Sequence, residues 1–399
     1  MPITEHAARF LLAPEGRALS RQAQTLLADG VDALPALTRL RRLAAPDLCA
    51  AAWELAVLRP RAVVKFGPDA AQLFVTRESL EQASGLRASA YHAARFRELG
   101  ATHVNDLCGG IGGDALAFAR AGLTVTLYER DPVRALFAQA NADACGLSHQ
   151  ISVRCEDVTQ AVLPPGAVWF DPARREGGRR IPRPDDYAPP LPLAHRWAEG
   201  GASPIGIKLS PAIDHALAAD YAADLEFLSE GGECKEALLW RGIVPADPHT
   251  VRAVLLSGLA PAVIAGSADT PIPLETDTLS GYLYEPDPAV IRAHLVGVLA
   301  PPLSAHAVDP SIAYLVSNTL TPTPFARAYQ VVERFPYSRR ALQNALSRLQ
   351  VGHVVIKKRG FPLEPDAVRK QLKLSGPDTL TVILTRQGDA HVVFLCRPL

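Results

Sequence analysis

The sequence predicts an α/β protein: a doubly wound, mostly parallel sheet, preceded by a helical region and followed by a smaller α/β unit. Short apolar segments that are typical of strands alternate with helical segments between residues 101 and 257. Residues 1–98 instead repeat apolar side chains at spacings of three and four, the period of a helix. Residues 258–280 are rich in Pro, Ala, Gly, Ser and Thr, so we expect a boundary or a long connection there.

Length and composition agree with a globular protein of several domains. The chain has 399 residues, of which 48% are apolar and 21% are charged, a balance typical of folded proteins. At about 100–200 residues per domain, this length predicts two or three domains, which we assign to residues 1–98, 99–260 and 281–399. Lys and Arg number 41 in total, as do Asp and Glu, so the net charge does not by itself indicate a nucleic-acid-binding protein.

Taken in order, the elements follow the hydrophobic period. The expected N-terminal helices lie in QAQTLLADGV (22–31), PDLCAAAWELAVLRPRA (46–62) and SGLRASAYHAARFRE (84–98), the last with Ser84 as a candidate cap. The expected parallel strands lie in HVNDLCGG (103–110), TVTLYE (124–129), ISVRCED (151–157), AVWFDP (167–172) and IGIKLS (205–210). Helices are expected in DALAFARAG (114–122) and PVRALFAQANADACG (132–146). We interpret ECKEALLW (233–240) and RAVLLS (252–257) as a closing antiparallel pair.

The C-terminal unit shows the same two periods. SRRALQNALSRLQ (338–350) and EPDAVRKQLKL (364–374) predict helices, and HVVIKKRG (353–360) predicts a strand. TLTVILTR and AHVVFLCRP, joined by Gln-Gly-Asp, predict a terminal hairpin.

A glycine-rich loop after the first strand is the strongest functional signal. Asp106 ends the strand, and Cys108, Gly110 and Gly112 lie in the loop that leads to a helix. Such a loop forms a binding crevice at the carboxyl end of a parallel sheet. Its spacing fits neither the dinucleotide fingerprint nor the phosphate loop. Because Asp106 would repel phosphates, the loop suits a ligand with a cationic end.

Two further acids end neighbouring strands. Glu129 ends the second strand, where an acid accepts hydrogen bonds from ribose hydroxyls, and Asp157 ends the third, where it could accept from an adenine amino group. A ligand with an amino-acid end, a ribose and an adenine is S-adenosyl-L-methionine. Each acid also has a structural explanation, because strand-end acids cap helices and turns without any ligand.

These segments resemble the class I methyltransferases. DLCGGIGGDALAFA, YERDP, CEDV and FDPAR look like their first four motifs, in order, within residues 101–257. The resemblance implies a Rossmann-like, seven-stranded sheet and S-adenosylmethionine as cofactor. It places Asp106, Cys108, Gly110 and Gly112 at the amino-acid end of the cofactor, Glu129 at the ribose, and Asp157 and Val158 at the adenine, and it makes Arg130 a further cofactor-binding residue. Cys108 departs from the commoner glycine.

Two flanking regions extend the resemblance. FVTRESLEQASG (74–85), here called the lead-in segment, resembles a segment of methyltransferases related to trimethylguanosine synthase that helps close the cofactor pocket. Thr76 in it is either a cofactor contact or a helix cap. From residue 281 the chain resembles the THUMP-like domain fused to bacterial class I methyltransferases, on the stretches YLYEPDPAVIRA, VDPSIAYL, TPFARAY, FPYSRRAL and IKKRG.

The fourth motif carries the candidate catalytic residues Asp171, Pro172, Ala173 and Arg174. In amino-directed methyltransferases a similar motif holds the target nitrogen and stacks an aromatic ring on the base; here alanine replaces the second proline and Arg174 replaces the aromatic. The motif also resembles the D-P-P-R of uridine ring-carbon methyltransferases, which need a nucleophile for which Cys234 is the candidate. A rigid turn is the structural alternative. Lys208, at the end of the fifth strand, could contact substrate or cap.

Two basic regions favour RNA as the substrate. The first is the loop 174–183, with five arginines and two glycines. The second is the C-terminal basic group, flanked by Tyr337 and Phe361. Its members are Arg339, Arg340, Arg348, Lys357, Lys358, Arg359, Arg369, Lys370 and Lys373. We therefore predict methylation of a nucleobase nitrogen in structured RNA. A methyltransferase for a small molecule or protein, and an RNA-binding protein with a vestigial cofactor site, remain the alternatives.

Other patterns argue against several classes of protein. Six scattered cysteines form no CxxC or CxH pair, so we expect neither a structural zinc site nor another metal. The sequence contains no stretch of about 18 apolar residues without charges, so we expect no membrane span. The N-terminus lacks the basic start and apolar run of a secretory signal. We expect a reduced, cytoplasmic protein without a membrane partner.

Overall fold

The computed structural model describes residues 3–173, 175–176, 179–180, 186–242, 250–274 and 281–399. Contacts between residues divide the chain into two units. Unit 1 comprises Met1–Leu209, Ala216–Ala223 and Leu238–Val244, and unit 2 comprises Ser210–His215, Asp224–Ala237 and Pro245–Leu399. The predicted boundaries at 98, 260 and 281 remain predictions.

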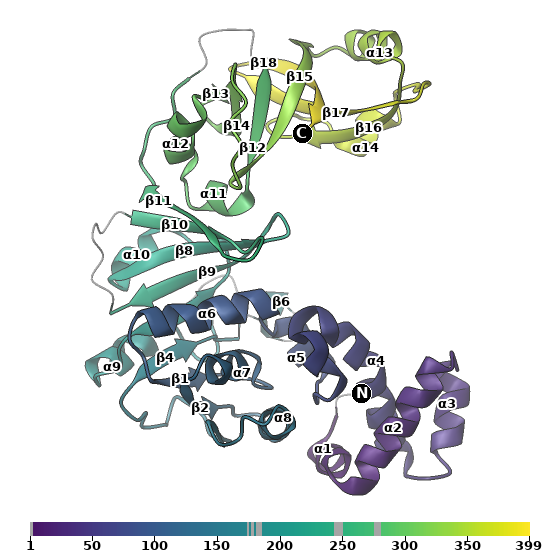
Figure 1. Ribbon diagram of the computed structural model, residues 1–399, viewed down its shortest axis with the longest axis vertical. Coiled ribbons are helices and arrows are strands. Elements are labelled where there is room, and N and C mark those ends of the chain that lie inside the picture. Colours follow the sequence, from purple (N-terminus) through teal and green to yellow (C-terminus); the bar gives the residue numbers. More distant parts are fainter. Residues whose placement is uncertain (1–2, 174, 177–178, 181–185, 243–249, 275–280) are drawn as a thin grey trace. The chain divides into compact units, whose positions relative to one another are not determined.

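Helices alone make up the N-terminal part of unit 1, as the spacing predicts (Figure 1). They are α1 (Glu5–Leu12), α2 (Pro14–Ala28), α3 (Ala33–Leu40), α4 (Pro46–Phe66), the short 3-10 helix η1 (Gly67–Ala71), α5 (Arg77–Gln82) and α6 (Leu86–Glu98). Gly67 ends α4 with a φ of 61°. The expectation that Ser84 caps α6 is wrong: Gly85 is the N-cap residue, and the Ser84 hydroxyl donates instead to Asp114.

The central sheet has nine strands in the order β11-β10-β8-β9-β7-β4-β1-β2-β3. They are β1 (His103–Leu107), β2 (Thr124–Tyr128), β3 (Ile151–Arg154), β4 (Ala167–Phe170), β7 (Ile205–Leu209), β8 (Ala223–Glu230), β9 (Glu233–Arg241), β10 (Thr250–Leu255) and β11 (Ala262–Ser267). β1 pairs in parallel with β2 and β4, β2 with β3, and β4 with β7. The predicted parallel, doubly wound arrangement is therefore confirmed.

The expected number of seven strands is wrong, because β10 and β11 extend the sheet beyond β8. The expected closing pair of β9 and β10 is also wrong. β10 pairs in parallel with β8 and antiparallel with β11, and β8 and β9 are joined by Gly231 and Gly232, both with positive φ. β11 lies inside the segment that we expected to be a connection.

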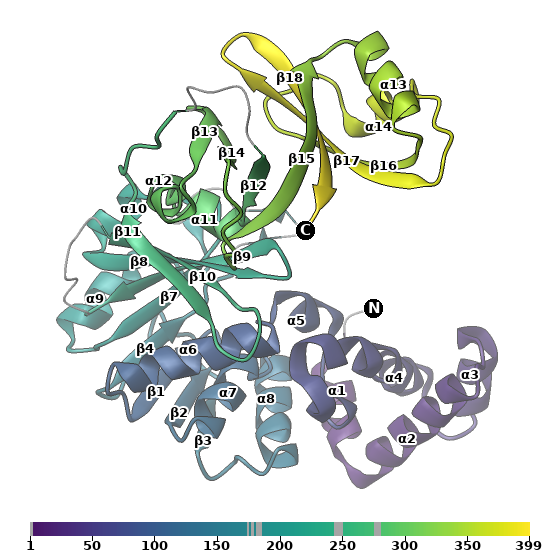
Figure 2. The same cartoon turned by 45° about the horizontal axis from the view of Figure 1, so that its top comes forward.

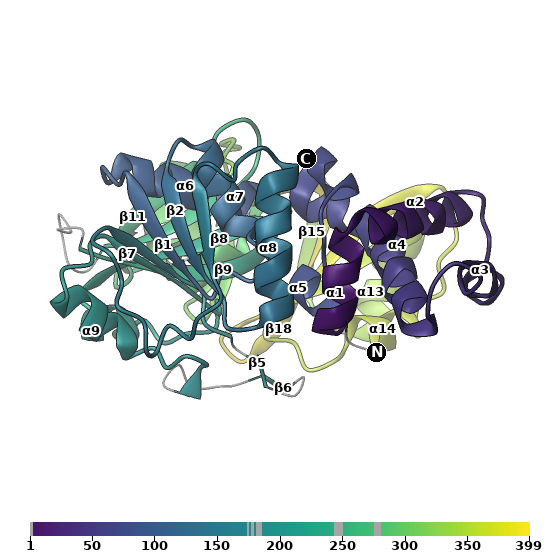
Figure 3. The ribbon, with the colours of Figure 1, turned by 90° about the horizontal axis from the view of Figure 1, so that it is seen from below.

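Helices α7 (Gly113–Arg120), α8 (Pro132–Ala144), α9 (Leu193–Glu199) and α10 (Ala216–Asp220) accompany the strands. Trp169 and Phe170 show how the sheet is covered, because successive strand residues face opposite sides. The Trp169 ring contacts those of Phe96 on α6 and Phe118 on α7, with centroids 6.1 Å apart in each pair. The Phe170 ring packs edge-on against Trp197 of α9 at 4.9 Å. Thus α6 and α7 cover one face and α9 the other (Figure 3).

Two two-residue strands, β5 (Arg175–Glu176) and β6 (Arg179–Arg180), pair antiparallel within the predicted basic loop. Arg174 and residues 181–185 lie outside the described part, as do the side chains of these four strand residues.

The C-terminal part of unit 2 is a second α/β structure (Figure 2). Its strands are β12 (Tyr282–Pro286), β13 (His306–Asp309), β14 (Ile312–Ser317), β15 (Ala326–Pro336), β16 (Val351–Lys358), β17 (Asp378–Gln387) and β18 (Ala390–Pro398), in the order β13-β14-β12-β15-β18-β17-β16. Its helices are α11 (Pro288–Arg292), α12 (Val296–Leu299), the 3-10 helix η3 (Pro301–Leu303), α13 (Arg339–Arg348) and α14 (Pro365–Arg369). The terminal hairpin β17–β18 forms as predicted.

Leu346 of α13 and Val368 of α14 pack with Val354 of β16 and Val382 of β17 in one apolar core. Both helices therefore cover the same face of this end of the sheet (Figure 2). Within the described ranges, no helix is both long and apolar enough to cross a bilayer.

Candidate active site

The loop between β1 and α7 takes a conformation that only small or strained residues allow. Gly110 and Gly112 have φ values of 58° and 88°, and Cys108 has a φ of 65°. This region is unfavourable for a residue with a Cβ atom, so Cys108 adopts a conformation that glycine would take more readily. A Cβ on Gly109 would lie 2.5 Å from Cγ of Leu127. The loop backbone therefore packs directly against the Leu127 side chain on β2.

Glu129, directly after β2, holds this loop in place. Its Oε2 accepts the backbone N–H of Gly110 at 3.0 Å, and its Oε1 accepts that of Asp131 at 2.8 Å. Burial raises the pKa of Glu129, although these two hydrogen bonds oppose the shift. The acid predicted to bind ribose thus has a loop-shaping role that the sequence did not reveal, and each oxygen keeps a second lone pair for a ligand.

Asp106 is an acid buried near the end of β1. Only 1% of the residue is exposed, and in the described part of the chain no group donates a hydrogen bond to its Oδ2. Burial raises its pKa well above the ordinary value, and the charges of Asp114 and Asp171 add to this effect. An unsatisfied buried carboxylate is costly, so this site favours a ligand that brings a donor or a positive charge.

Asp171 follows β4, and its Oδ2 accepts a hydrogen bond from Lys208 Nζ at 2.7 Å. Lys208, on β7, is 3% exposed and also donates to Ser84 Oγ at 2.9 Å. Ser84 in turn donates to Asp114 Oδ2 at 2.8 Å, and Nδ1 of the fully buried His92 lies 2.9 Å from Asp114 Oδ1. We call these five side chains the polar chain.

Sequence reasoning missed His92, Asp114 and Ser84 as members of this group. Asp114 is the second residue of α7, and burial alone would raise its pKa. The hydrogen bond and charge of His92, with the charge of Lys208, reverse that effect and lower the pKa of Asp114. Its position one residue after the glycine loop was the signal that could have identified it.

Pro172 and Ala173 do not form an open loop. Ala173 and Ala188 exchange two backbone hydrogen bonds, of 3.0 and 3.2 Å, in an antiparallel bridge. Pro172 is buried. Arg174, the expected replacement for the aromatic platform, lies outside the described residues.

Several predicted site residues do come together. The charges of Glu129, Asp171 and Asp106 add to burial in raising the pKa of the Cys108 thiol, while that of Arg130 opposes them. β1 pairs in parallel with both β2 and β4, so the carboxyl ends of these three strands lie side by side, as expected.

The third predicted acid is placed differently. Asp157 is exposed and lies in a turn after β3, where its Oδ1 accepts the backbone N–H of Thr159 at 2.9 Å. This hydrogen bond lowers the pKa of Asp157. Val158 beside it is buried, and Arg130 is exposed.

Thr76 caps α5 through a reciprocal pair of hydrogen bonds with Ser79. Thr76 Oγ1 accepts the Ser79 N–H at 3.1 Å, and Ser79 Oγ accepts the Thr76 N–H at 2.9 Å. The structure therefore gives Thr76 the capping role, and its cofactor contact remains a prediction.

Asn141 on α8 fixes the start of the lead-in segment. Its Oδ1 accepts the Phe74 N–H at 2.7 Å, and its Nδ2 donates to the carbonyls of Phe74 and Ile111, both at 3.0 Å. Ile111 belongs to the glycine loop, so one buried amide joins the lead-in segment to that loop. This residue was not predicted, because it lies within an ordinary helical pattern.

The C-terminal basic group is partly neutralised. Lys357 and Arg359 pair with Glu285, Lys358 with Glu364, and Arg348 with Glu333. The remaining members, which are Arg339, Arg340, Arg369, Lys370 and Lys373, are exposed. Phe361, expected to flank this group, is 6% exposed and packs edge-on against Tyr337 at 4.8 Å. It packs in the apolar core rather than standing exposed beside the basic group.

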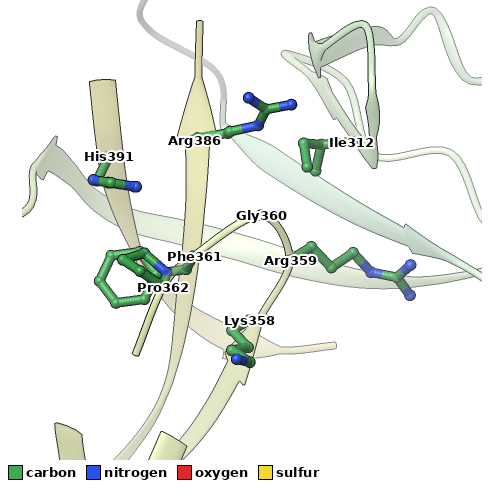
Figure 4. Close-up of a pocket in the computed structure, with 8 residues that line it drawn as sticks. All are labelled: Ile312, Lys358, Arg359, Gly360, Phe361, Pro362, Arg386 and His391. Carbon is green, nitrogen blue, oxygen red and sulfur yellow. The ribbon is translucent and has the colours of Figure 1, made fainter. Parts of the chain in front are cut away.

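A pocket of about 540 Å³ lies beside this group. Figure 4 shows Lys358, Arg359, Arg386 and His391 around Gly360. Arg386 was not predicted; its Nη2 donates to Ser311 Oγ at 2.6 Å. Basic side chains gathered in one pocket favour an anion, although Lys358 and Arg359 are also paired with Glu364 and Glu285.

Among the described residues, no group of three or more His, Cys, Asp or Glu side chains could hold a metal ion.

Comparisons with known proteins agree over most of the chain. Residues 326–398 match the THUMP domain-like family, and residues 5–62 match a domain of unknown function, DUF8688. The chain is 31% identical over 358 residues to an uncharacterized S-adenosylmethionine-dependent methyltransferase of Mycobacterium tuberculosis H37Rv, covering 86% of this chain and 96% of that protein. A crystal structure from Porphyromonas gingivalis W83, assigned to a methyltransferase, has a TM-score of 0.74 and 25% identity, covering 96% of this chain and 97% of its own.

Proposed function

Because the chain belongs to the family of S-adenosylmethionine-dependent methyltransferases, we propose that it methylates a nucleobase nitrogen in structured RNA, ribosomal or transfer. Methyl transfer and the cofactor follow from the family. The residue roles and the RNA substrate are our proposals.

The unpartnered Oδ2 of Asp106 is the observation that carries the site assignment. A buried carboxylate at the mouth of a glycine loop fits the ammonium of the amino-acid end of S-adenosylmethionine, which would supply the missing donor. Cys108, Gly110 and Gly112 would enclose that end, because their backbone approaches without bulky side chains. The donor set of this chain therefore fits the cofactor.

The other acids would hold the rest of the cofactor. Glu129 has one lone pair left on each oxygen for the ribose hydroxyls. Asp157 and Val158 would contact the adenine, with the exposed carboxylate as acceptor and the apolar side chain against the ring. Arg130 and Thr76 would border the ribose and the amino-acid end.

At the acceptor side, Lys208 occupies Oδ2 of Asp171, so we assign Oδ1 to the amine hydrogen of the target base. The Ala173 carbonyl already accepts from Ala188, which leaves the Pro172 carbonyl as the second acceptor. Arg174 would contact the base or its phosphate.

When bound, S-adenosylmethionine supplies a methyl group made electrophilic by its sulfonium. Transfer would form a carbon–nitrogen bond to the base and break the methyl–sulfur bond of the cofactor, which would leave as S-adenosylhomocysteine, and the nitrogen would release one proton. Asp171 holds the nitrogen in line and accepts that proton. Positioning and exclusion of water supply most of the rate enhancement, so a strong base is unnecessary.

The C-terminal domain supports RNA as the substrate. It matches the THUMP domain-like family, and its pocket gathers Lys358, Arg359, Arg386 and His391. Phosphates provide most of the affinity in RNA binding, and basic side chains in a concavity suit them.

Calorimetric titration with S-adenosylmethionine and S-adenosylhomocysteine tests the site. We expect micromolar binding by the wild type and its loss in Asp106→Ala and Glu129→Ala. Transfer of a labelled methyl group to total RNA from cells lacking the gene tests the substrate. Cofactor binding with no labelled RNA, but with labelled metabolites or proteins, would favour the alternative substrates; binding of RNA without turnover would indicate a vestigial site.

A further inference from the structure

The polar chain runs behind the proposed acceptor side of the site and belongs to unit 1. It contains His92 on α6, Asp114 on α7, Ser84 between α5 and α6, Lys208 on β7 and Asp171 after β4. The four links between these side chains are all between 2.7 and 2.9 Å long. Burying polar and charged groups costs desolvation free energy, so the polar chain calls for an explanation.

Ser84 is the central member. Its hydroxyl donates to Asp114 and accepts from Lys208, so it uses its one proton and one lone pair in opposite directions. Alanine at this position would remove both links at once. The residue lies at the C-terminal end of the lead-in segment, whose start Asn141 ties to the glycine loop.

Asp114 connects the polar chain to the glycine loop through the start of α7. It follows Gly113, and Gly112 is the N-cap residue of α7. Any rearrangement of the loop on a ligand therefore moves the first turn of α7, and Asp114 with it. The charge on Asp114 is maintained, because His92 and Lys208 lower its pKa.

Lys208 sits between two carboxylates, one indirectly through Ser84 and one directly at Asp171. The Lys208 ammonium is held by Ser84 and bonds to Oδ2 of Asp171 at 2.7 Å. This bond restricts the rotation of the Asp171 side chain, because rotation would carry Oδ2 out of hydrogen-bonding distance of Nζ. The orientation of Oδ1 is fixed in consequence.

We propose that Lys208 is the positioning residue for Asp171, and that Ser84 and Asp114 couple this positioning to the cofactor loop. The proposal rests on the proposed function, in which the loop binds the cofactor and Asp171 the acceptor. Its consequence is cooperativity: a bound cofactor orders the acceptor carboxylate before the substrate arrives.

Hydrogen exchange of the full-length protein, with S-adenosylhomocysteine as the probe, tests this coupling without a known substrate. In the wild type, we expect the probe to slow exchange in peptides covering 107–113 and also 168–173. In Ser84→Ala and Lys208→Met, we expect binding within about threefold of wild type and protection of 107–113, but loss of the added protection at 168–173.

Two matched variants separate coupling from general loosening. Ser89→Ala removes a hydroxyl of similar burial that bonds only within its own helix region, to Gly85 and Leu86, and should behave as wild type. Ser84→Thr keeps a hydroxyl and should restore the protection. Once an RNA substrate is labelled, Lys208→Met should lower kcat more than tenfold with little change in the KM for the cofactor.

Persistence of the added protection at 168–173 in both variants, or its absence from the wild type, would overturn the coupling and leave the proposed function standing. Failure of the folded wild type to bind the probe would instead overturn the proposed site. If Lys208→Met does not fold, Ser84→Ala decides the question. Ser84→Ala keeps the Lys208 ammonium and its bond to Asp171, whereas Lys208→Met removes the positive charge from beside that carboxylate.

Discussion

Glu129 Oε2 accepts the backbone N–H of Gly110 at 3.0 Å, so the acid at the end of β2 shapes the loop that follows β1. The other oxygen accepts the N–H of Asp131 at the start of α8. One carboxylate thus fixes the loop and the next helix relative to each other, before any ligand is considered.

Glu129→Gln should therefore weaken cofactor binding by about 5- to 150-fold. Glutamine has one oxygen, so the N–H of Gly110 or that of Asp131 loses its acceptor, at a cost of about 1–3 kcal/mol. Calorimetry with S-adenosylmethionine measures the change. Glu156→Gln is the control, because Glu156 is exposed; equal affinities for both variants would contradict this role.

Asp106→Asn should stabilise the ligand-free protein at pH 8 while abolishing cofactor binding. Burial raises the folded-state pKa of Asp106 above its unfolded value of about 3.9. Its favourable contribution to stability is therefore complete below about pH 4 and is lost as the pH rises through the folded-state pKa. Thermal unfolding should show a higher Tm for the variant at pH 8, by a few degrees per kcal/mol, and a small difference at pH 4.

Asp143→Asn, at an exposed site, provides the control for Asp106→Asn. If Asp106→Asn is less stable than wild type at pH 8, the buried carboxylate does not destabilise the ligand-free protein. If the variant binds the cofactor normally, Asp106 does not contribute to cofactor binding.

Asn141→Leu should release the lead-in segment. The change leaves the N–H of Phe74 and the carbonyls of Phe74 and Ile111 without their partner, and we expect a loss of about 3 kcal/mol. Urea unfolding measures the loss, and faster hydrogen exchange in peptides covering 72–84 localises it. Gln139→Ala, which removes a more exposed hydrogen bond to Asp143, should change neither quantity by much; comparable effects would argue against a specific anchor.

Arg386→Gln should weaken RNA binding about 3- to 10-fold at 0.15 M salt and leave the affinity for S-adenosylmethionine unchanged. Losing one phosphate contact should reduce the slope of the logarithm of the affinity against the logarithm of the salt concentration by about one. Fluorescence anisotropy with total tRNA over a range of salt concentrations measures both. Arg9→Gln, at an exposed pair with Glu5, controls for loss of charge; an unaltered salt slope in Arg386→Gln would remove the pocket from the RNA-binding surface.

Cys234→Ala should retain methyl transfer within about twofold. Burial raises the pKa of the Cys234 thiol to about 12, so at pH 8 it carries almost no thiolate, the nucleophilic form. Ring-carbon methylation of uridine needs such a nucleophile. Loss of activity in a folded Cys234→Ala protein would revive that chemistry.

The strands and most helices could be predicted because their apolar periods are local properties of the sequence. The acids Asp106, Glu129 and Asp171 could be predicted as a group because each lies at the carboxyl end of a strand of one parallel sheet: Asp106 is near the end of β1, and the other two directly follow β2 and β4. β11 was missed because an edge strand needs little burial, and its surroundings have the composition of a loop.

His92, Ser84 and Asn141 could not be predicted as site residues. Each lies in or beside a helix, and its partner is 22 to 67 residues away in sequence. Hydrophobic period identifies which face of a helix is buried but not which polar side chain on that face meets a distant one. Lys208 was noticed as a strand end, but its bonds to Ser84 and Asp171 appear only in three dimensions.

The distance in sequence between Phe74 and Asn141 has a consequence for synthesis on the ribosome. The lead-in segment emerges before α8 exists, so its anchor at Asn141 forms only after another 67 residues have been added. We therefore expect the N-terminal helices to leave the exit tunnel early but to dock late. During that interval they would offer chaperones and proteases a surface that the finished protein conceals.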